Sequence, residues 1–418
     1  MNTTDRFHAL DAVRGFALLA GILLHASTSF FRAVPIADSS QSSALALLCF
    51  VIHTFRMTLF FIIAGYFARL LLERRGVKGF IKNRSTRIVG PTLVGWVILV
   101  PLTTGVLIWS AVRHLSAPPA AAVLASVPAT MLPHTVHAVP MMHLWFLYYL
   151  CIFYVAALVL YWLCNGLLDR AGRLRGGLDT IMRKLLGGYL APWVFALPLF
   201  LVLGFDDRIV VSLGIPTPEM GLNPNKPALV AFGTAFALGW FVHRQPAILN
   251  EWRNRWIGHL AVGVTLTVLC VTVLRVVPGA KTGWLLESAV LSRAAYLGCY
   301  MGSIWYWSFA VTGVALRFYS GESAVRRYLA DSSYWLYLVH MPIVYFLQVV
   351  LAPVPWHWAI KFPLILLITM TLLLLSYHYC VRSTWIGQIL NGRKYPRQAA
   401  APTAPPRPAL GAAGLCGG

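Results

Sequence analysis

The segment FHALDAVRGFALLAGILLHAS near the N-terminus carries ionisable side chains within an otherwise apolar run. Arg14 and His25 are eleven residues apart. In a helix this spacing is three turns plus about 20°, so both side chains lie on one face. Asp11, Leu18 and Gly21 join that face. The rise from Arg14 to His25 is about 16 Å, roughly half the thickness of a bilayer's hydrocarbon core. In a membrane helix this face would connect an anion-binding arginine near the cytoplasmic surface with a buried base.

A structural interpretation of the same face stays open. Arg14 could reach the interface and pair with Asp11, while His25 hydrogen-bonds a neighbouring helix. Burying an ionisable group in a bilayer costs free energy, so such groups more often have a function than a purely structural role. This cost favours a functional role for His25. For Arg14 taken alone, the functional and the structural interpretation are equally well supported.

A second apolar segment, HTFRMTLFFIIAGYF, places His53 and Arg56 three residues apart and therefore on one helical face. Arg56 lies well inside the segment and needs a partner or water there. An interhelical ion pair or a capped carbonyl explains it as well as a direct catalytic role does.

The basic run ERRGVKGFIKNRSTRI follows, and four of its arginines are candidates for contact with a nucleotide-like donor: Arg74, Arg75, Arg84 and Arg87. Arginine binds phosphate by charge and by bidentate hydrogen bonds. Basic residues on the cytoplasmic side also set membrane topology, and on the run alone this is the better explanation. Neither GxxxxGK[ST] nor GxGxxG occurs in the chain.

Two later segments add histidines. MMHLWFLYYL places His143 and Trp145 at the predicted outer surface, where an aromatic belt also explains the tryptophan. SSYWLYLVHMPIV places His340 near the middle of a span, where a hydrogen-bonded structural histidine is the safer interpretation. We treat His143, Trp145 and His340, with His53 and Arg56, as candidate pore or acceptor contacts.

Motifs for other chemistries do not occur. The chain has no GxSxG, HExxH or CxxC sequence, and its seven cysteines have no metal-ligand spacing. We therefore expect no metal site and no bound cofactor. Catalysis would depend on histidine with arginine and a carboxylate, through acid–base chemistry or a transient acyl-histidine.

The elements that must position these residues are membrane helices. Hydrophobic residues make up 58% of the 418 and charged residues only 11%, against about 25% charged in soluble domains. Apolar runs recur between polar breaks, which predicts an all-α polytopic membrane protein with about ten transmembrane helices. The predicted spans are 13–31, 45–71, 88–110, 142–163, 189–204, 227–243, 257–276, 288–316, 331–351 and 358–381.

Charge gives the predicted orientation. With both termini cytoplasmic, 23 of the 34 Lys and Arg residues lie in cytoplasmic segments, as the positive-inside rule expects. The net charge of +21 therefore reflects topology and not nucleic-acid binding. We expect one transmembrane domain, 1–384, and a disordered Pro/Ala/Gly-rich cytoplasmic tail, 385–418.

Taken together, the segments resemble the integral-membrane acyltransferase family 3. The resemblance rests on ALDAVRGFALLAGILLHAS, on FRMTLFFIIAGYF with the following RSTRI, on HLWFLYYL and on SYWLYLVHMPIV, which occur in the family's order. The HTFRMTLFF and LERRG segments look most like the branch associated with succinylating periplasmic glucans.

The resemblance implies a bacterial inner-membrane enzyme. The family moves an acyl group from cytoplasmic acyl-CoA, here succinyl-CoA or acetyl-CoA, to a periplasmic or envelope glycan. Carried over, His25 is the catalytic base or acyl carrier, Arg14 acts on the donor side, and Arg84 and Arg87 help to dock the CoA phosphates.

Three alternatives stay open. Within the enzyme class, the chain could be an O-acetyltransferase of lipopolysaccharide or another envelope glycan. Outside it, buried His and Arg also mark the pathways of transporters or flippases of a glycan or anionic solute, although no inverted repeat is visible. A structural subunit leaves the aligned face of Asp11, Arg14 and His25 unexplained.

Overall fold

The computed structural model describes residues 3–31, 34, 36–113, 140–165, 169, 173–186, 188–204, 215–216, 221–274, 289–392 and 394–395. These residues form helices and no strand. The main helices are α1 (Thr3–Ser27), α2 (Ser43–Arg84), α3 (Gly90–Val112), α5 (Trp145–Leu163), α6 (Arg173–Leu186), α7 (Ala191–Leu203), α9 (Lys226–Arg244), α10 (Ala247–Leu274), α11 (Ala289–Phe318), α12 (Ala324–Leu351), α13 (Trp358–Ser376) and α14 (Trp385–Asn391). Short 3₁₀ or π segments are η1 (Thr28–Phe31), η2 (Ser85–Val89), η5 (Met142–Leu144) and η7 (Tyr377–Val381).

The predicted all-α membrane architecture is confirmed, and a helix occurs in each of the ten predicted ranges. Among the described residues, six helical stretches are long and apolar enough to cross a membrane, or seven if α6 and α7, bent by 106°, form one span. One of the six, Ser43–Val112, contains both α2 and α3. With 13 residues, α7 is shorter than the about 20 that a spanning helix needs. The count of ten spans and the cytoplasmic position of both termini stay predictions.

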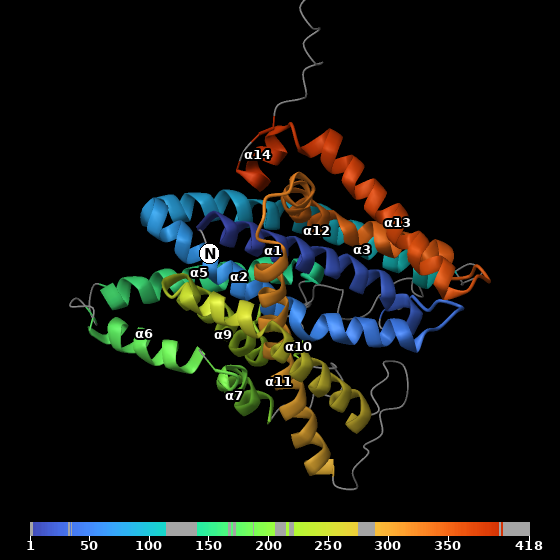
Figure 1. Cartoon of the computed structure of the whole chain (residues 1–418). Helices are drawn as coiled ribbons and strands as arrows, with labels where there is room; N and C mark the ends of the chain where they lie inside the picture. Colours follow the sequence, from blue (N-terminus) through green and yellow to red (C-terminus); the bar gives the residue numbers. More distant parts are fainter. Residues whose placement is uncertain are drawn as a thin grey trace, which may run out of the picture.

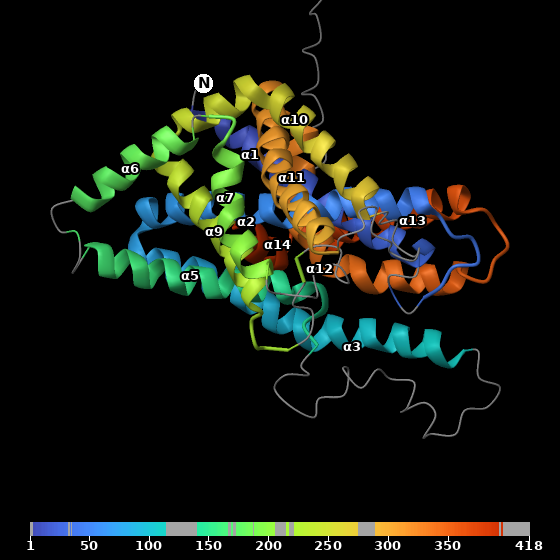
Figure 2. The same ribbon diagram turned by 90° about the horizontal axis from the view of Figure 1, so that it is seen from below.

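Helix α1 occupies the centre of the bundle. It contacts α2, α11, α12 and α13, and the two views show it lying among these helices (Figure 1, Figure 2). Helices α10 and α11 pack together along their length, and α9 packs on α2. The face of α1 that carries Arg14, Gly21 and His25 lines cavities within the bundle.

The turn between α2 and α3 carries the basic run. Gly76 interrupts α2 with a φ of 62°, a backbone conformation that favours glycine. The chain then continues to Arg84 and through the π-helical segment η2 into α3. This bend brings Arg74 and Arg75, which precede it, to the same cavity as Arg84 and Arg87, which follow it.

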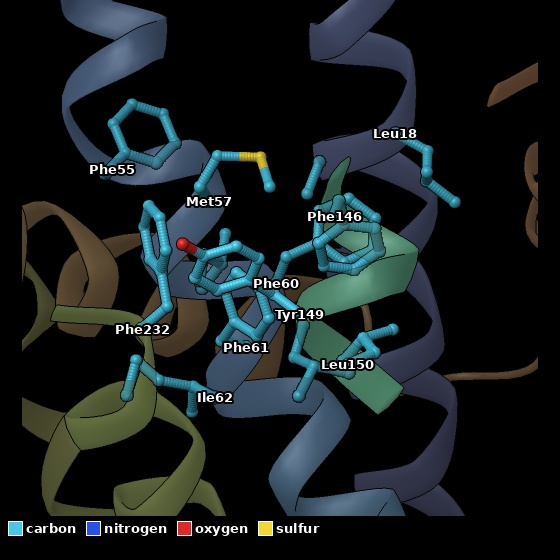
Figure 3. Packing of buried hydrophobic residues seen from close by; sticks show 14 of the residues in the cluster. Leu18, Phe55, Met57, Phe60, Phe61, Ile62, Phe146, Tyr149, Leu150 and Phe232 are labelled. Carbon is cyan, nitrogen blue, oxygen red and sulfur yellow. The ribbon is translucent and has the colours of Figure 1, made fainter. Parts of the chain in front are cut away.

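Aromatic side chains fill the core between α2, α5 and α9. The Phe61 ring stacks on Phe232 with centroids 4.8 Å apart, and contacts Phe146 at 5.0 Å. Phe60 contacts the same Phe146 at 4.8 Å. Figure 3 shows this packing, which fixes α5 against the middle of α2.

The predicted boundary of the disordered tail is wrong. Residues Trp385–Asn391 form α14, which ends at Gly392 with a φ of 74°. Gly387 and Leu390 are buried, and the guanidinium group of Arg87 donates two hydrogen bonds to the Leu390 carbonyl. The Pro/Ala/Gly-rich composition begins only after residue 398, so the segment before it has apolar residues to bury. The rest of the predicted tail lies outside the described residues.

Candidate functional site

The histidine cavity is a hollow of about 220 Å³ beside the C-terminal half of α1. Six predicted residues line it: His25 from α1, His53 and Arg56 from α2, His143 from η5, Trp145 from α5 and His340 from α12. The structure therefore gathers the complete predicted pore set around His25. Sequences more than 300 residues apart meet here, because α1 packs along α12.

Three imidazoles form a row in this cavity. The ring centroids of His25 and His340 are 5.3 Å apart, and those of His340 and His143 are also 5.3 Å apart. Within the described part of the chain, no group of three or more His, Cys, Asp or Glu residues is arranged to hold a metal ion. The arrangement is suited to proton transfer between imidazoles and a bound hydroxyl group.

Backbone contacts assign the tautomers of two of these rings. Nδ1 of His340 lies 2.7 Å from the Tyr337 carbonyl oxygen, and Nε2 of His143 lies 3.0 Å from the Leu338 carbonyl oxygen. A carbonyl only accepts, so each of these nitrogens carries the proton. The second nitrogen of each neutral ring holds a lone pair, and neither one has a hydrogen-bond partner among the described residues.

Arg56 reaches the cavity beside Gly21, one turn before His25. A Cβ atom at Gly21 would lie 2.3 Å from an Nη atom of Arg56. The missing side chain therefore leaves the space that the guanidinium group occupies. The positive charge lies near His25, where it can meet an anionic group of a ligand.

The basic cavity, of about 370 Å³, lies at the other end of the same α1 face. Arg14 lines it, and so do the four predicted donor-site arginines Arg74, Arg75, Arg84 and Arg87. Arg74 and Arg75 are exposed at its edge, whereas Arg84 and Arg87 are half-buried. Five guanidinium groups around one cavity provide the charge that a polyphosphate ligand requires.

Local contacts orient three of these arginines. Arg14 forms an ion pair of 3.1 Å with Asp11, the pairing that the structural interpretation predicts, and both residues also line a third polar cavity at the start of α12. Arg84 lies over the Tyr154 ring at 4.7 Å. Arg87 is held by the Leu390 carbonyl, so it faces the basic cavity with part of its hydrogen-bonding capacity already used.

A single layer of side chains separates the two cavities. Leu18, Phe60, Phe146 and Tyr337 line both of them. Figure 3 shows Phe60 of α2 against Phe146 of α5, with Leu18 on the adjacent α1. We call these four residues the dividing layer. Arg14 and His25 thus lie on opposite sides of it, as their spacing along one helix predicts.

Two tyrosines of α12 near the cavities are not among the residues predicted from the sequence. The Tyr337 hydroxyl donates to the His143 carbonyl at 2.5 Å, which fixes η5 beside the histidine cavity. The Tyr334 hydroxyl donates to the Arg87 carbonyl at 2.8 Å beside the basic cavity. Both precede His340 at intervals of three residues, and this helical spacing is the signal that could have found them.

Fold and site together define a polytopic membrane protein with a basic cavity and a histidine cavity joined along one helix. The sequence pattern of the family described as an acyltransferase domain, acyltransferase family 3, matches residues 7–378. The chain belongs to this family, and it is a membrane acyltransferase.

Individual proteins match a shorter part of the chain than the family pattern does. Glucans biosynthesis protein C of Escherichia coli (strain K12) is 36% identical over 101 residues, which are 24% of this chain and 25% of the relative. The protein of the same name from Escherichia coli O9:H4 (strain HS) is 35% identical over 101 residues. The match spans a quarter of the length of these relatives. No solved structure matches the chain.

Proposed function

We propose that this protein moves an acyl group, succinyl in the first instance, from cytoplasmic acyl-CoA to hydroxyl groups of a periplasmic glucan or related envelope glycan, in a bacterial inner membrane. The observation that supports this most is the pair of cavities on one face of α1. One is lined by arginines and the other by histidines, and only the dividing layer lies between them.

In this proposal the basic cavity binds the donor. The CoA phosphates contact Arg84, Arg87, Arg74 and Arg75, and Arg14 acts on the donor closer to the thioester. The acyl end passes the dividing layer to reach His25. A donor that spans both cavities explains why arginines and histidines lie in line and not in one cluster.

The histidine cavity then holds the reacting groups. His25 acts as a base on the acceptor hydroxyl or carries the acyl group transiently, and either role requires a neutral imidazole in the cavity. Arg56 neutralises the free carboxylate of a succinyl group. The relatives are named as glucans biosynthesis proteins, which supports a carbohydrate acceptor.

Mass spectrometry of the envelope tests this function. The wild type and His25→Ala would be expressed at equal membrane levels in a strain that lacks the activity. We expect succinyl esters on periplasmic glucans only with the wild type. Acetyl esters instead would identify the acetyltransferase alternative. Esters with both proteins would remove His25 from its essential role, and esters with neither, across several hosts, would favour the transporter alternative.

A second variant tests the acyl group. Arg56→Ala should reduce succinyl transfer more than acetyl transfer, because a succinyl group brings a negatively charged carboxylate into the cavity and an acetyl group does not. If a folded Arg56→Ala protein transfers succinyl at the wild-type rate, the proposed role of Arg56 is wrong.

A further inference from the structure

His340 is buried in the wall of the histidine cavity, yet only half of its hydrogen-bonding capacity is used. Its Nδ1–H donates to the Tyr337 carbonyl, which leaves Nε2 with a lone pair. Nε2 is buried and has no hydrogen-bond partner among the described residues. A buried lone pair without a donor is unfavourable, and a ligand hydroxyl in the cavity would satisfy it.

The position of His340 relative to His25 is that of a second reacting group. Both rings line the same cavity, with centroids 5.3 Å apart. A hydroxyl group bound between the two imidazoles could be within hydrogen-bonding reach of both. His25 lies on the face that also carries Arg14 and Leu18, whereas His340 lies on α12, between His25 and His143.

We propose that His340 is a catalytic residue and the proton acceptor for the attacking hydroxyl, an inference that rests on the proposed acyl transfer. The hydroxyl oxygen bonds to the acyl carbon while its proton passes to Nε2 of His340. In this step His25 has the second of its two proposed roles: it has attacked the thioester carbon, displaced the CoA thiolate and now carries the acyl group. The bond from the acyl carbon to His25 breaks with its electron pair on the ring nitrogen. The CoA thiolate takes a proton from water, and His340 returns its own proton to water.

Because only Nδ1 of His340 carries a proton, one substitution can remove Nε2 and keep the bond made by Nδ1. The side-chain amide of His340→Asn can place an N–H near the position of Nδ1, so it can keep the bond to the Tyr337 carbonyl and lack only the basic Nε2. If His340 only stabilises α12, this variant should be nearly neutral. If Nε2 accepts the proton, kcat should fall about 100-fold, with the KM for acyl-CoA unchanged.

His259→Asn is the matched control. His259 is also a buried histidine, on α10 against Tyr189 and Phe309, and it lines none of the cavities described above. We expect its transfer rate to stay within a few-fold of the wild type. Equal amounts of folded protein in the membrane would be confirmed for both variants.

The outcomes separate the two proposals. An active wild type with a slow His340→Asn and an active His259→Asn supports the role of His340. An active wild type with His340→Asn at the rate of the control contradicts that role and leaves the acyltransferase function intact. A wild type that transfers no acyl group contradicts the proposed function and the role of His340 with it.

Discussion

At the scale of single residues, Gly21 controls where Arg56 lies. An alanine there would place its Cβ 2.3 Å from the guanidinium group, which is the mobile end of a long side chain and can move away. We expect Gly21→Ala to lower transfer by about 10- to 100-fold, because a displacement of this size disturbs a reacting geometry. Stability should not fall, since alanine favours a helix over glycine by about 1 kcal/mol.

The control for this prediction is Gly105→Ala in α3, where nothing lies within 4 Å of the added Cβ. Gly105→Ala should gain the same helix propensity, and its acyl-transfer rate should equal that of the wild type. Thermal unfolding in detergent and the transfer rate would be measured for both variants. Unchanged transfer in Gly21→Ala would show that the position of Arg56 does not matter to the reaction.

Sequence alone could predict the residues that share one helix. Arg14, Leu18, Gly21 and His25 follow from spacing, because helical periodicity is local. The roles of partners between helices could not be predicted in this way. Gln348, for example, donates to the His25 and Ala26 carbonyls from a position more than 320 residues away, and only the packing of α12 on α1 reveals it.

At the scale of elements, a buried ion pair joins the α1–α2 connection to helix α13. Lys361 of α13 donates to Asp38 at 2.8 Å and to Ser39 at 3.0 Å, and both charged side chains are almost completely inaccessible. Asp38 lies between α1 and α2. The pair therefore fixes the α1–α2 connection against the start of α13, at the same end of α1 as His25.

Removing one partner of this pair should be costly. We expect Lys361→Met to destabilise the protein by about 3–5 kcal/mol, because a buried carboxylate loses its counter-charge. Adding Asp38→Asn should recover most of that loss, since the amide can still accept from the Ser40 N–H, which now bonds to Asp38 at 2.7 Å. Unfolding of the two single variants and the double variant would be compared. If the losses in unfolding free energy of the two single variants add up to that of the double variant, Lys361 and Asp38 do not stabilise each other.

At the scale of the whole molecule, orientation decides which cavity faces the cytoplasm. The positive-inside rule predicts that the α11–α12 connection is cytoplasmic and the α12–α13 connection is periplasmic. Gly321 and Trp356 are exposed in these two connections. A membrane-impermeant thiol reagent should label Trp356→Cys in intact cells, and Gly321→Cys only after lysis. The reverse pattern would place the basic cavity away from cytoplasmic acyl-CoA.

The dividing layer keeps the basic cavity and the histidine cavity apart. Phe60 is part of it, and Phe60→Ala would join the basic and histidine cavities. Water could then reach the thioester from both sides, and water competes with the acceptor hydroxyl for the acyl group. We expect the ratio of free CoA thiol to glycan ester to rise several-fold in this variant, with less ester formed in each turnover.

Phe55→Ala separates this effect from a loss of packing. Phe55 is also buried on α2, where it stacks on Trp307 at 5.4 Å and lines neither cavity. Both substitutions remove a phenyl group from the core, at about 3–5 kcal/mol each. Only Phe60→Ala should uncouple thioester cleavage from ester formation. An equal ratio in both variants would mean that the layer does not exclude water, so that coupling depends on how the acceptor binds beside His25.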